Sequence, residues 1–157
     1  MPHMELDGFD RRILAELQSE GRITNQELSD RVGLSPSPCL RRLRRLEESG
    51  AISRYVALVD PAALGLTVTA FVRVRLSRQN DRNLAAFEKA IADFPEVMEC
   101  YLMTGDADYH LRILVDSLTA FEDFLRYKLT RIAGVSQVTS SFGLRPVVYR
   151  TAIPALP

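Results

Sequence analysis

Residues 24–52 have the sequence TNQELSDRVGLSPSPCLRRLRRLEESGAI, which predicts two helices joined by a short turn. Leu28 and Val32 stand four positions apart, so they share one face of the first helix. Gly33 breaks this helix, as glycine commonly does at a helix end. Ser35 then offers a hydroxyl cap to the second helix, because the first backbone N–H groups of a helix have no partner within it.

The second of these helices has an apolar side and a basic side. Pro36 suits its first position, where no backbone donor is needed. Leucines recur every three residues and predict one buried stripe: Leu40, Leu43 and Leu46. At about 100° per residue, Arg41 and Arg45 point almost opposite this stripe, and Arg42 and Arg44 flank it. Such a helix fits the major groove of double-stranded DNA, where arginine contacts guanine edges or phosphates.

The polar residues of this helix divide into two kinds of candidate DNA contact. Arg41 and Arg45 are the candidates for base edges, since they lie opposite the apolar stripe. The candidates for phosphate contacts are Ser35, Ser37, Arg42 and Arg44. Two other interpretations stay open. The arginines could form a solvated face partly paired with nearby glutamates, or Arg42 could make a structural salt bridge to the first helix of the chain.

The composition is that of an ordinary globular protein. At 157 residues the chain is long enough for one domain or two small ones, and 46% of it is hydrophobic and 25% charged. Cys39 and Cys100 stand in separate motifs, which gives no disulfide framework and favours a reducing compartment. We expect Cys39 to be a small packing residue. Residues 1–4 resemble a cloning remnant. We find no signal peptide, and no apolar run approaches the ~20 residues that span a bilayer, so we expect no membrane partner.

The net charge is zero, but the charge is unevenly distributed. Residues 35–54 contain five arginines against two glutamates, a local excess of three positive charges. A local basic patch on a neutral protein favours contacts at particular DNA sites over indiscriminate coating of DNA.

Helices and strands alternate along the rest of the chain. We expect a helix over residues 7–19 before the pair described above, then a strand or extended linker over 52–59 and a helical turn over 60–65. From residue 66 the pattern predicts strands over 68–76, 97–104, 109–115 and 135–144, and helices over 80–94 and 117–132. The last helix should turn four side chains inward: Leu118, Phe121, Leu125 and Ile132.

The order β-α-β-β-α-β predicts a ferredoxin-like sandwich, in which two helices cover one face of an antiparallel sheet. The other face also has to be covered, and a second copy of the chain is the expected cover. The sequence therefore predicts a homodimer.

Motifs in both halves of the chain fall at the spacing of one family. In the first half they are Leu6-Asp7-x-x-Asp10-x-x-Ile13-Leu14, Gly21-Arg22, Glu27-Leu28, Val32-Gly33-Leu34-Ser35 and Arg42-x-x-x-Leu46-Glu47-x-x-Gly50-x-Ile52. In the second half they are Val97-x-Glu99-Cys100-Tyr101, Thr104-Gly105-Asp106-x-Asp108-Tyr109 and Gly134-Val135. From Leu6 to about Arg145 the chain resembles the Lrp/AsnC (leucine- and asparagine-responsive, or feast-or-famine) transcription regulators of bacteria and archaea.

The resemblance implies an α+β fold with three parts. These are a winged helix-turn-helix domain over residues 5–53, a linker strand and turn over 54–65, and a ferredoxin-like domain over 66–151 for ligand binding and oligomerisation. It also implies a cytoplasmic regulator of transcription whose partners are double-stranded DNA, a second copy of itself and a small amino acid. Family members form dimers, often four in a ring with DNA wrapped outside, and amino acids typically bind between the dimers.

The turn Gly105-Asp106-Ala107-Asp108-Tyr109 matches the family's effector loop. Its glycine exposes backbone N–H groups to a carboxylate, and Asp108 is the candidate to accept hydrogen bonds from an effector's ammonium group. The candidate effector residues are Leu102, Met103, Thr104, Gly105, Asp106, Asp108, Tyr109 and Ser140. The alternative is a tight hairpin in which both aspartates satisfy turn backbone. The effector's identity stays open, since many relatives carry two threonines where this chain has Val138 and Ser140.

Other functions are less well supported by the residues. Asp106, Asp108 and His110 stand two apart and could ligate a metal, but no other motif completes a site. The chain has no Ser/His/Asp set, no phosphate-binding glycine loop and no paired-cysteine motif, so we expect neither catalysis nor a cofactor other than the amino-acid effector. The remaining alternatives are a ligand-independent architectural DNA-binding protein and an amino-acid-binding oligomer with a vestigial helix-turn-helix.

Overall fold

The computed structural model describes residues 5–154, so the suspected cloning remnant at residues 1–4 lies outside it. The described chain divides into two compact units, one formed by residues 5–58 with 148–154 and the other by Val59–Val147. Residues 148–151, which we expected at the end of the second domain, are thus grouped with the first unit. There the Gln18 side chain donates to the Ile153 carbonyl at 3.0 Å and accepts from the Ile153 N–H at 2.6 Å.

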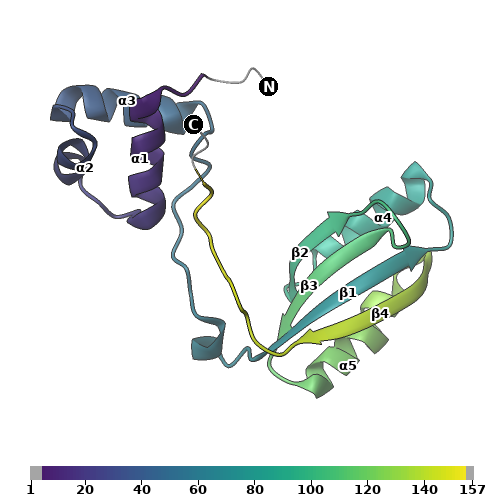
Figure 1. Cartoon of the computed structure of the whole chain (residues 1–157). Coiled ribbons are helices and arrows are strands. Elements are labelled where there is room, and N and C mark those ends of the chain that lie inside the picture. The colour runs from purple at the N-terminus through teal and green to yellow at the C-terminus, as the bar shows by residue number, and fades with distance from the viewer. Residues whose placement is uncertain (1–4, 155–157) are drawn as a thin grey trace. The chain divides into compact units, whose positions relative to one another are not determined.

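The first unit contains three helices, α1 (Gly8–Ser19), α2 (Asn25–Val32) and α3 (Pro36–Glu48) (Figure 1). Thr24 caps α2 reciprocally with Glu27, and Gly33 ends the helix in the left-handed conformation at φ 74°. The helices enclose a small apolar core of Ile13, Leu28, Val32, Cys39 and Leu46. Cys39 is buried and has the packing role that we expected of it.

Two details of α3 differ from the sequence prediction. Its buried stripe contains Cys39 and Leu46, with Leu43 packed against them, whereas Leu40 lies outside this core. Ser35 has the extended backbone of a capping residue, but its side chain makes no capping hydrogen bond. A serine cap bonds the N–H of the second or third helical residue, and Pro38 at the third position has no N–H, so only the N–H of Ser37 is left as a possible donor.

After α3, residues 53–60 form no strand, so the expected strand or linker is an irregular segment. The expected helical turn is present as η1 (Pro61–Leu64), with Asp60 capping its start and Gly65 ending it at φ 75°.

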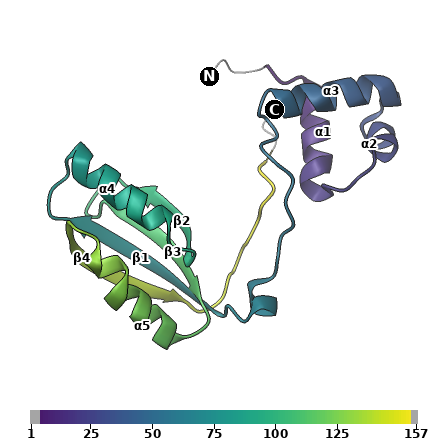
Figure 2. The same cartoon turned by 180° about the vertical axis from the view of Figure 1, so that it is seen from behind.

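The second unit has the predicted βαββαβ order. Its strands are β1 (Val68–Leu76), β2 (Val97–Leu102), β3 (Tyr109–Val115) and β4 (Val135–Gly143), arranged in the sheet as β2-β3-β1-β4. All three neighbouring pairs are antiparallel. Helices α4 (Asp81–Ala92) and α5 (Leu118–Tyr127) cover the same face of the sheet (Figure 2). The ferredoxin-like prediction is confirmed.

The core of this unit lies between the sheet and the two helices. Alternate residues of β1 are buried, and the ring of Tyr109 stacks on Phe87 with centroids 4.4 Å apart. The prediction for α5 was wrong in two respects. Leu118 is 63% exposed while Phe124 is buried, and the helix ends at Tyr127, after which Leu129–Arg131 form a short 3-10 turn, η2.

Within residues 5–154, none of the helices has the length and apolar character that a bilayer crossing requires.

Candidate functional sites

The outward face of α3 carries the first candidate site. Arg41 and Arg44 are exposed, and none of the described residues forms an ion pair with either. A shallow hollow of about 390 Å³ lies on this face, lined by Ser37, Leu40, Arg41, Arg44, Arg45 and Glu48. Leu40 therefore contributes an apolar patch among the cations. Ser35 is also exposed, at the start of the helix.

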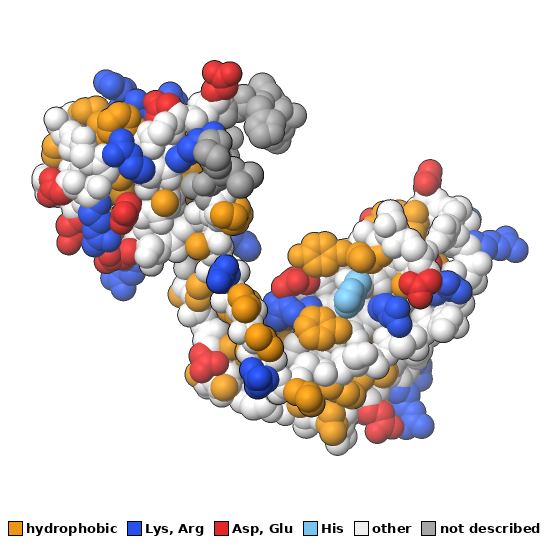
Figure 3. All heavy atoms as spheres, viewed as in Figure 1, with side chains coloured by type: hydrophobic (Ala, Val, Ile, Leu, Met, Phe, Trp, Pro, Cys, Tyr) orange, Lys and Arg blue, Asp and Glu red, His pale blue; other side chains and the backbone are white. Residues whose placement is uncertain are grey.

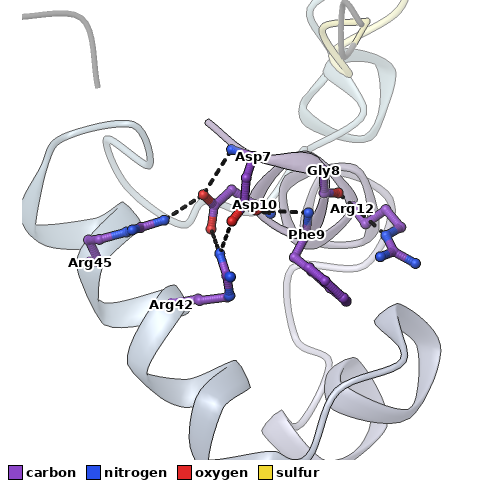
Figure 4. Close-up of polar contacts among 7 residues, drawn as sticks. All are labelled: Asp7, Gly8, Phe9, Asp10, Arg12, Arg42 and Arg45. Carbon is purple, nitrogen blue, oxygen red and sulfur yellow. Dashed lines mark hydrogen bonds and ion pairs between the residues drawn. The ribbon is translucent and has the colours of Figure 1, made fainter. Parts of the chain in front are cut away.

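Arg42 and Arg45 instead converge on one buried carboxylate (Figure 4). Asp10 of α1 is fully buried and accepts from Arg42 Nη1 at 2.9 Å and from Arg45 Nη2 at 2.5 Å. Arg42 also donates to Asp7 Oδ2 at 2.6 Å, and its side chain is only 24% exposed. The salt bridge to the first helix, which the sequence left open for Arg42, is thus present. Arg45 keeps a half-exposed side chain, at 51%.

Asp7 and Asp10 also organise the start of α1. Asp7 Oδ1 accepts from the N–H groups of Phe9 and Asp10, at 2.9 and 3.0 Å, while Asp10 Oδ2 accepts from the Asp7 N–H at 3.2 Å. The hydrogen bonds from the Asp10 N–H and from Arg42 lower the pKa of Asp7 to about 2. The same two carboxylates therefore cap α1 and hold α3 against it.

The second candidate site is the turn between β2 and β3, which we call the effector turn and define as residues 103–108. The Met103 N–H donates to the Asp108 carbonyl at 2.8 Å, which closes the turn. Gly105 has φ +116°, a conformation that L side chains rarely adopt. Among the described hydrogen bonds, none comes from the backbone N–H groups of residues 104–107. Four successive N–H groups of the turn therefore have no hydrogen-bond acceptor among the described residues.

Asp108 has a different role from the one we expected. Instead of facing an effector's ammonium group, its carboxylate is buried and already bonded: Oδ2 accepts from the Leu76 N–H at 2.6 Å and Oδ1 accepts from Gln79 Nε2. Its own N–H donates to the Val74 carbonyl at 2.9 Å. These contacts fasten the end of the turn to β1.

Two other predicted effector residues do not belong to the exposed surface of the turn. Tyr109 is buried, and its hydroxyl donates to Glu88 Oε1 at 2.8 Å. Ser140 pairs with Val72 on the helix-covered side of the sheet, and β1 separates its strand from β3. The exposed members are contiguous: Leu102, Met103, Thr104, Gly105 and Asp106.

Sequence reasoning missed two arginines beside the turn. Arg75 donates through Nε at 2.8 Å and through Nη2 to the Asp106 carbonyl, and Arg73 Nη1 lies 3.5 Å from Asp106 Oδ2. Alternation along β1 could have placed both on the exposed side of the strand. Their contact with the turn depends on the pairing of β1 with β3, which one strand's pattern does not reveal.

The potential metal ligands and the two cysteines are the other residues that could carry chemistry. No group of three potential metal-binding side chains occurs in the part of the chain that the structure describes. Cys39 and Cys100 are both free thiols, and burial raises the pKa of each, to about 11 for Cys100.

Comparison with known families and structures agrees with this geometry. Residues 6–53 match the winged helix-turn-helix DNA-binding family, and residues 69–153 match the Lrp/AsnC ligand binding domain. The chain belongs to the Lrp/AsnC family. It is thus an Lrp/AsnC DNA-binding transcriptional regulator and not an enzyme.

Individual Lrp/AsnC relatives match over nearly the full chain. The Bkd operon transcriptional regulator of Pseudomonas aeruginosa is 46% identical over 150 residues, covering 96% of this chain and 98% of the relative. The leucine-responsive regulatory protein of Rhizobium meliloti is 44% identical over 144 residues, covering 92% of each. A transcriptional regulator from Neisseria meningitidis, solved as its L-Met complex, has a TM-score of 0.91 and 41% identity, covering 96% of this chain and 97% of that one.

Proposed function

We propose that this Lrp/AsnC regulator binds a pseudo-palindromic DNA site as a homodimer and that a small amino acid, bound at the effector turn, modulates its DNA binding or assembly. One observation carries the DNA-binding half. Helix α3 is anchored to α1 through the buried Asp10 and turns Arg41 and Arg44 to solvent. Recognition helices need such a fixed orientation, since base contacts tolerate little movement.

The anchoring divides the arginines of α3 by role. Arg41 is the leading candidate for a base-edge contact, and Arg44, Ser35 and Ser37 are candidates for phosphates. Arg45 reaches DNA with the nitrogens that Asp10 does not hold. Arg42 acts as the anchor, since two carboxylates already surround its guanidinium.

The free N–H groups of residues 104–107 support the effector half. Successive backbone N–H groups form a concave donor set that binds carboxylates. The Neisseria meningitidis relative was solved with L-Met, and the Rhizobium meliloti relative is named leucine-responsive. We therefore propose an α-amino acid with an apolar side chain, whose carboxylate meets these N–H groups beside Leu102 and Met103. Asp108 shapes the turn in this arrangement instead of binding the amine.

The open face of the sheet, opposite α4 and α5, supports the homodimer. We define it by the side chains of Phe71, Arg73, Arg75, Glu99, Tyr101, His110 and Arg112, which share one side of the paired strands. Figure 3 shows hydrophobic side chains beside a histidine on this face. Phe71 and Tyr101 are 39% and 59% exposed, so a second copy would bury two aromatic rings per protomer. We also propose that four such dimers assemble around a central axis and that the protein is located in the cytoplasm.

A ligand-independent architectural DNA-binding protein is the second candidate. It is favoured by the contacts of Asp108, because both oxygens expected to meet an effector are taken by Leu76 and Gln79.

Two measurements test the proposal. DNA selected from random duplexes by the full chain is titrated at several salt concentrations with the wild type, Arg41→Ala, Arg44→Ala and the control Arg82→Ala, an exposed arginine of α4. Loss of a phosphate contact should lower the slope of log affinity against log salt by ~0.9, and loss of a base contact should cost ~1–3 kcal/mol and relax specificity at one position. Unchanged binding in both α3 variants would exclude α3 as the DNA-contacting helix.

The effector is tested by thermal shift with the twenty amino acids. A ligand at about 100 times its dissociation constant should stabilise the native state by ~2.7 kcal/mol, which raises the melting temperature by several degrees. A response to one or a few amino acids supports the effector-modulated regulator. A uniform lack of response favours the architectural candidate.

A further inference from the structure

Three successive residues of β1 hold the effector turn. The Val74 carbonyl accepts from the Asp108 N–H at 2.9 Å, and the Leu76 N–H donates to Asp108 Oδ2 at 2.6 Å. Between them, Arg75 reaches the Asp106 carbonyl with two guanidinium N–H groups. The first two contacts are made by backbone groups of β1, so they do not depend on which side chains stand at positions 74 and 76. The third depends on the side chain of Arg75.

The pairing of β1 explains why Arg75 is placed to make this contact. The ladder with β3 ends at Val74, opposite Tyr109, so the next residue of β1 runs beside the turn instead of beside a strand. On the other side, the register with β4 shifts between Arg75 and Leu76, and the Ser136 hydroxyl donates to the Arg75 carbonyl at 3.0 Å. The backbone of Arg75 is therefore held while its guanidinium extends along the open face.

The hydrogen bonds from Arg75 to the Asp106 carbonyl fix the orientation of the peptide group between Asp106 and Ala107. In a trans peptide the C=O and N–H groups point in opposite directions, and the described chain contains no cis peptide. When Arg75 holds the Asp106 carbonyl, the N–H of Ala107 must point away from Arg75. This N–H is one of the four free donors of the turn. The orientation of this peptide depends on the ψ angle of Asp106 and the φ angle of Ala107, and Gly105, one residue earlier, adds backbone freedom to the turn, so the orientation would otherwise be poorly fixed.

We propose that Arg75 is a positioning residue of the effector site, which fixes the peptide between Asp106 and Ala107 so that the turn presents its N–H groups to a carboxylate. This inference rests on the proposed function, since it assigns the donor set to an amino-acid effector. Arg73 adds to the arrangement, because it lies 3.5 Å from the Asp106 carboxylate and partly offsets a negative charge that would repel the ligand.

The first test needs no effector. Amide exchange at Met103 and Asp108, whose N–H groups close and fasten the turn, is measured by NMR on the full chain. The variants are Arg75→Met, Arg75→Lys and the control Arg82→Met. Arg75→Met should exchange about tenfold faster at both amides, because the turn opens locally more often. The control should match the wild type. Exchange in Arg75→Met equal to that of the wild type overturns the inference, whether or not any amino acid binds.

The second test measures affinity for L-methionine and L-leucine by calorimetry. Arg75→Met should bind about tenfold more weakly than the wild type and Arg82→Met equally well, with unchanged melting temperatures in the absence of ligand. Arg75→Lys should also be weak, since one ammonium group cannot reproduce the two-pronged contact. Full recovery by lysine overturns the positioning role in favour of a simple charge effect. If exchange rises in Arg75→Met while the wild type binds no amino acid, the effector proposal fails and the positioning of the turn by Arg75 stands.

Discussion

Replacing Asp10 by asparagine is the sharpest test of how the recognition helix is held. The carboxylate of Asp10 is fully buried and accepts three hydrogen bonds, from Arg42 at 2.9 Å, from Arg45 at 2.5 Å and from the Asp7 N–H at 3.2 Å. Asparagine has one acceptor oxygen, and its NH₂ group would face a guanidinium with donor against donor. The variant therefore loses the charge and at least one hydrogen bond.

The expected loss follows from the exposure of the partners. Removing one member of a fully buried ion pair costs about 3–5 kcal/mol, because the other charge is left without a partner. Here Arg42 and Arg45 are 24% and 51% exposed, so each can turn toward water. We therefore expect a smaller loss, about 2–3 kcal/mol for the first unit, in line with one or two charge-assisted hydrogen bonds.

Native-state hydrogen exchange measures this loss within the first unit alone. The amides of Ile13 and Leu46, in the core that α1 and α3 share, should exchange about 30- to 150-fold faster in Asp10→Asn, at a factor of ten for each 1.4 kcal/mol. The matched control is Asp30→Asn, an exposed carboxylate of α2 that contacts the Gln26 side chain. A change below about 0.5 kcal/mol, the usual range for a surface substitution, would refute the anchoring role of Asp10.

Three further predictions follow from the pKa values and backbone angles. Hydrogen bonds from the Asp10 N–H and Arg42 lower the pKa of Asp7 from 3.8 to about 2, so its stabilising contribution is complete above about pH 4 and disappears as the pH falls through 2. Acid titration by circular dichroism should show this loss, and Asp7→Asn should lack it. Burial raises the pKa of Cys100 from 9.0 to about 11, so its reaction with a disulfide reagent should be slow at pH 8 and accelerate about tenfold per pH unit up to that value. A rate at pH 8 equal to that of free cysteine would contradict this. Gly105→Ala places a residue with a Cβ at φ +116° and should lower the local stability of the turn by about 1–3 kcal/mol. Faster exchange of the Met103 amide measures this loss, and unchanged exchange would mean that the turn relaxes without strain.

Local signals in the sequence were sufficient for the elements and their order. The predicted strand over 109–115 has the observed bounds, because Tyr109–Val115 follows a turn and ends before the capping Ser117. Errors arose where one amphipathic pattern allowed two faces. In α3 the spacing of the leucines predicted a buried stripe through Leu40, but Cys39 lies in the core instead. A single cysteine contributes less to a hydrophobic pattern than a run of leucines does, so the pattern favoured the wrong residue. In α5 the helical spacing of the apolar residues predicted that Leu118 is buried, whereas it is exposed at the start of the helix.

The sequence by itself determined the family, the two-part α+β fold, the basic helix and the position of the glycine-containing turn between β2 and β3. Each of these depends on residues within a few positions of one another, such as the Thr24–Glu27 capping box or Gly105 at the turn. Only the tertiary structure decided which polar side chains are already engaged in hydrogen bonds or ion pairs within the protein. Asp10 meets Arg45 across 35 positions of the chain, and Asp108 meets the Leu76 N–H across 32. A carboxylate looks the same in a sequence whether it faces water or a buried donor, because its partners are set by how helices pack and how strands pair.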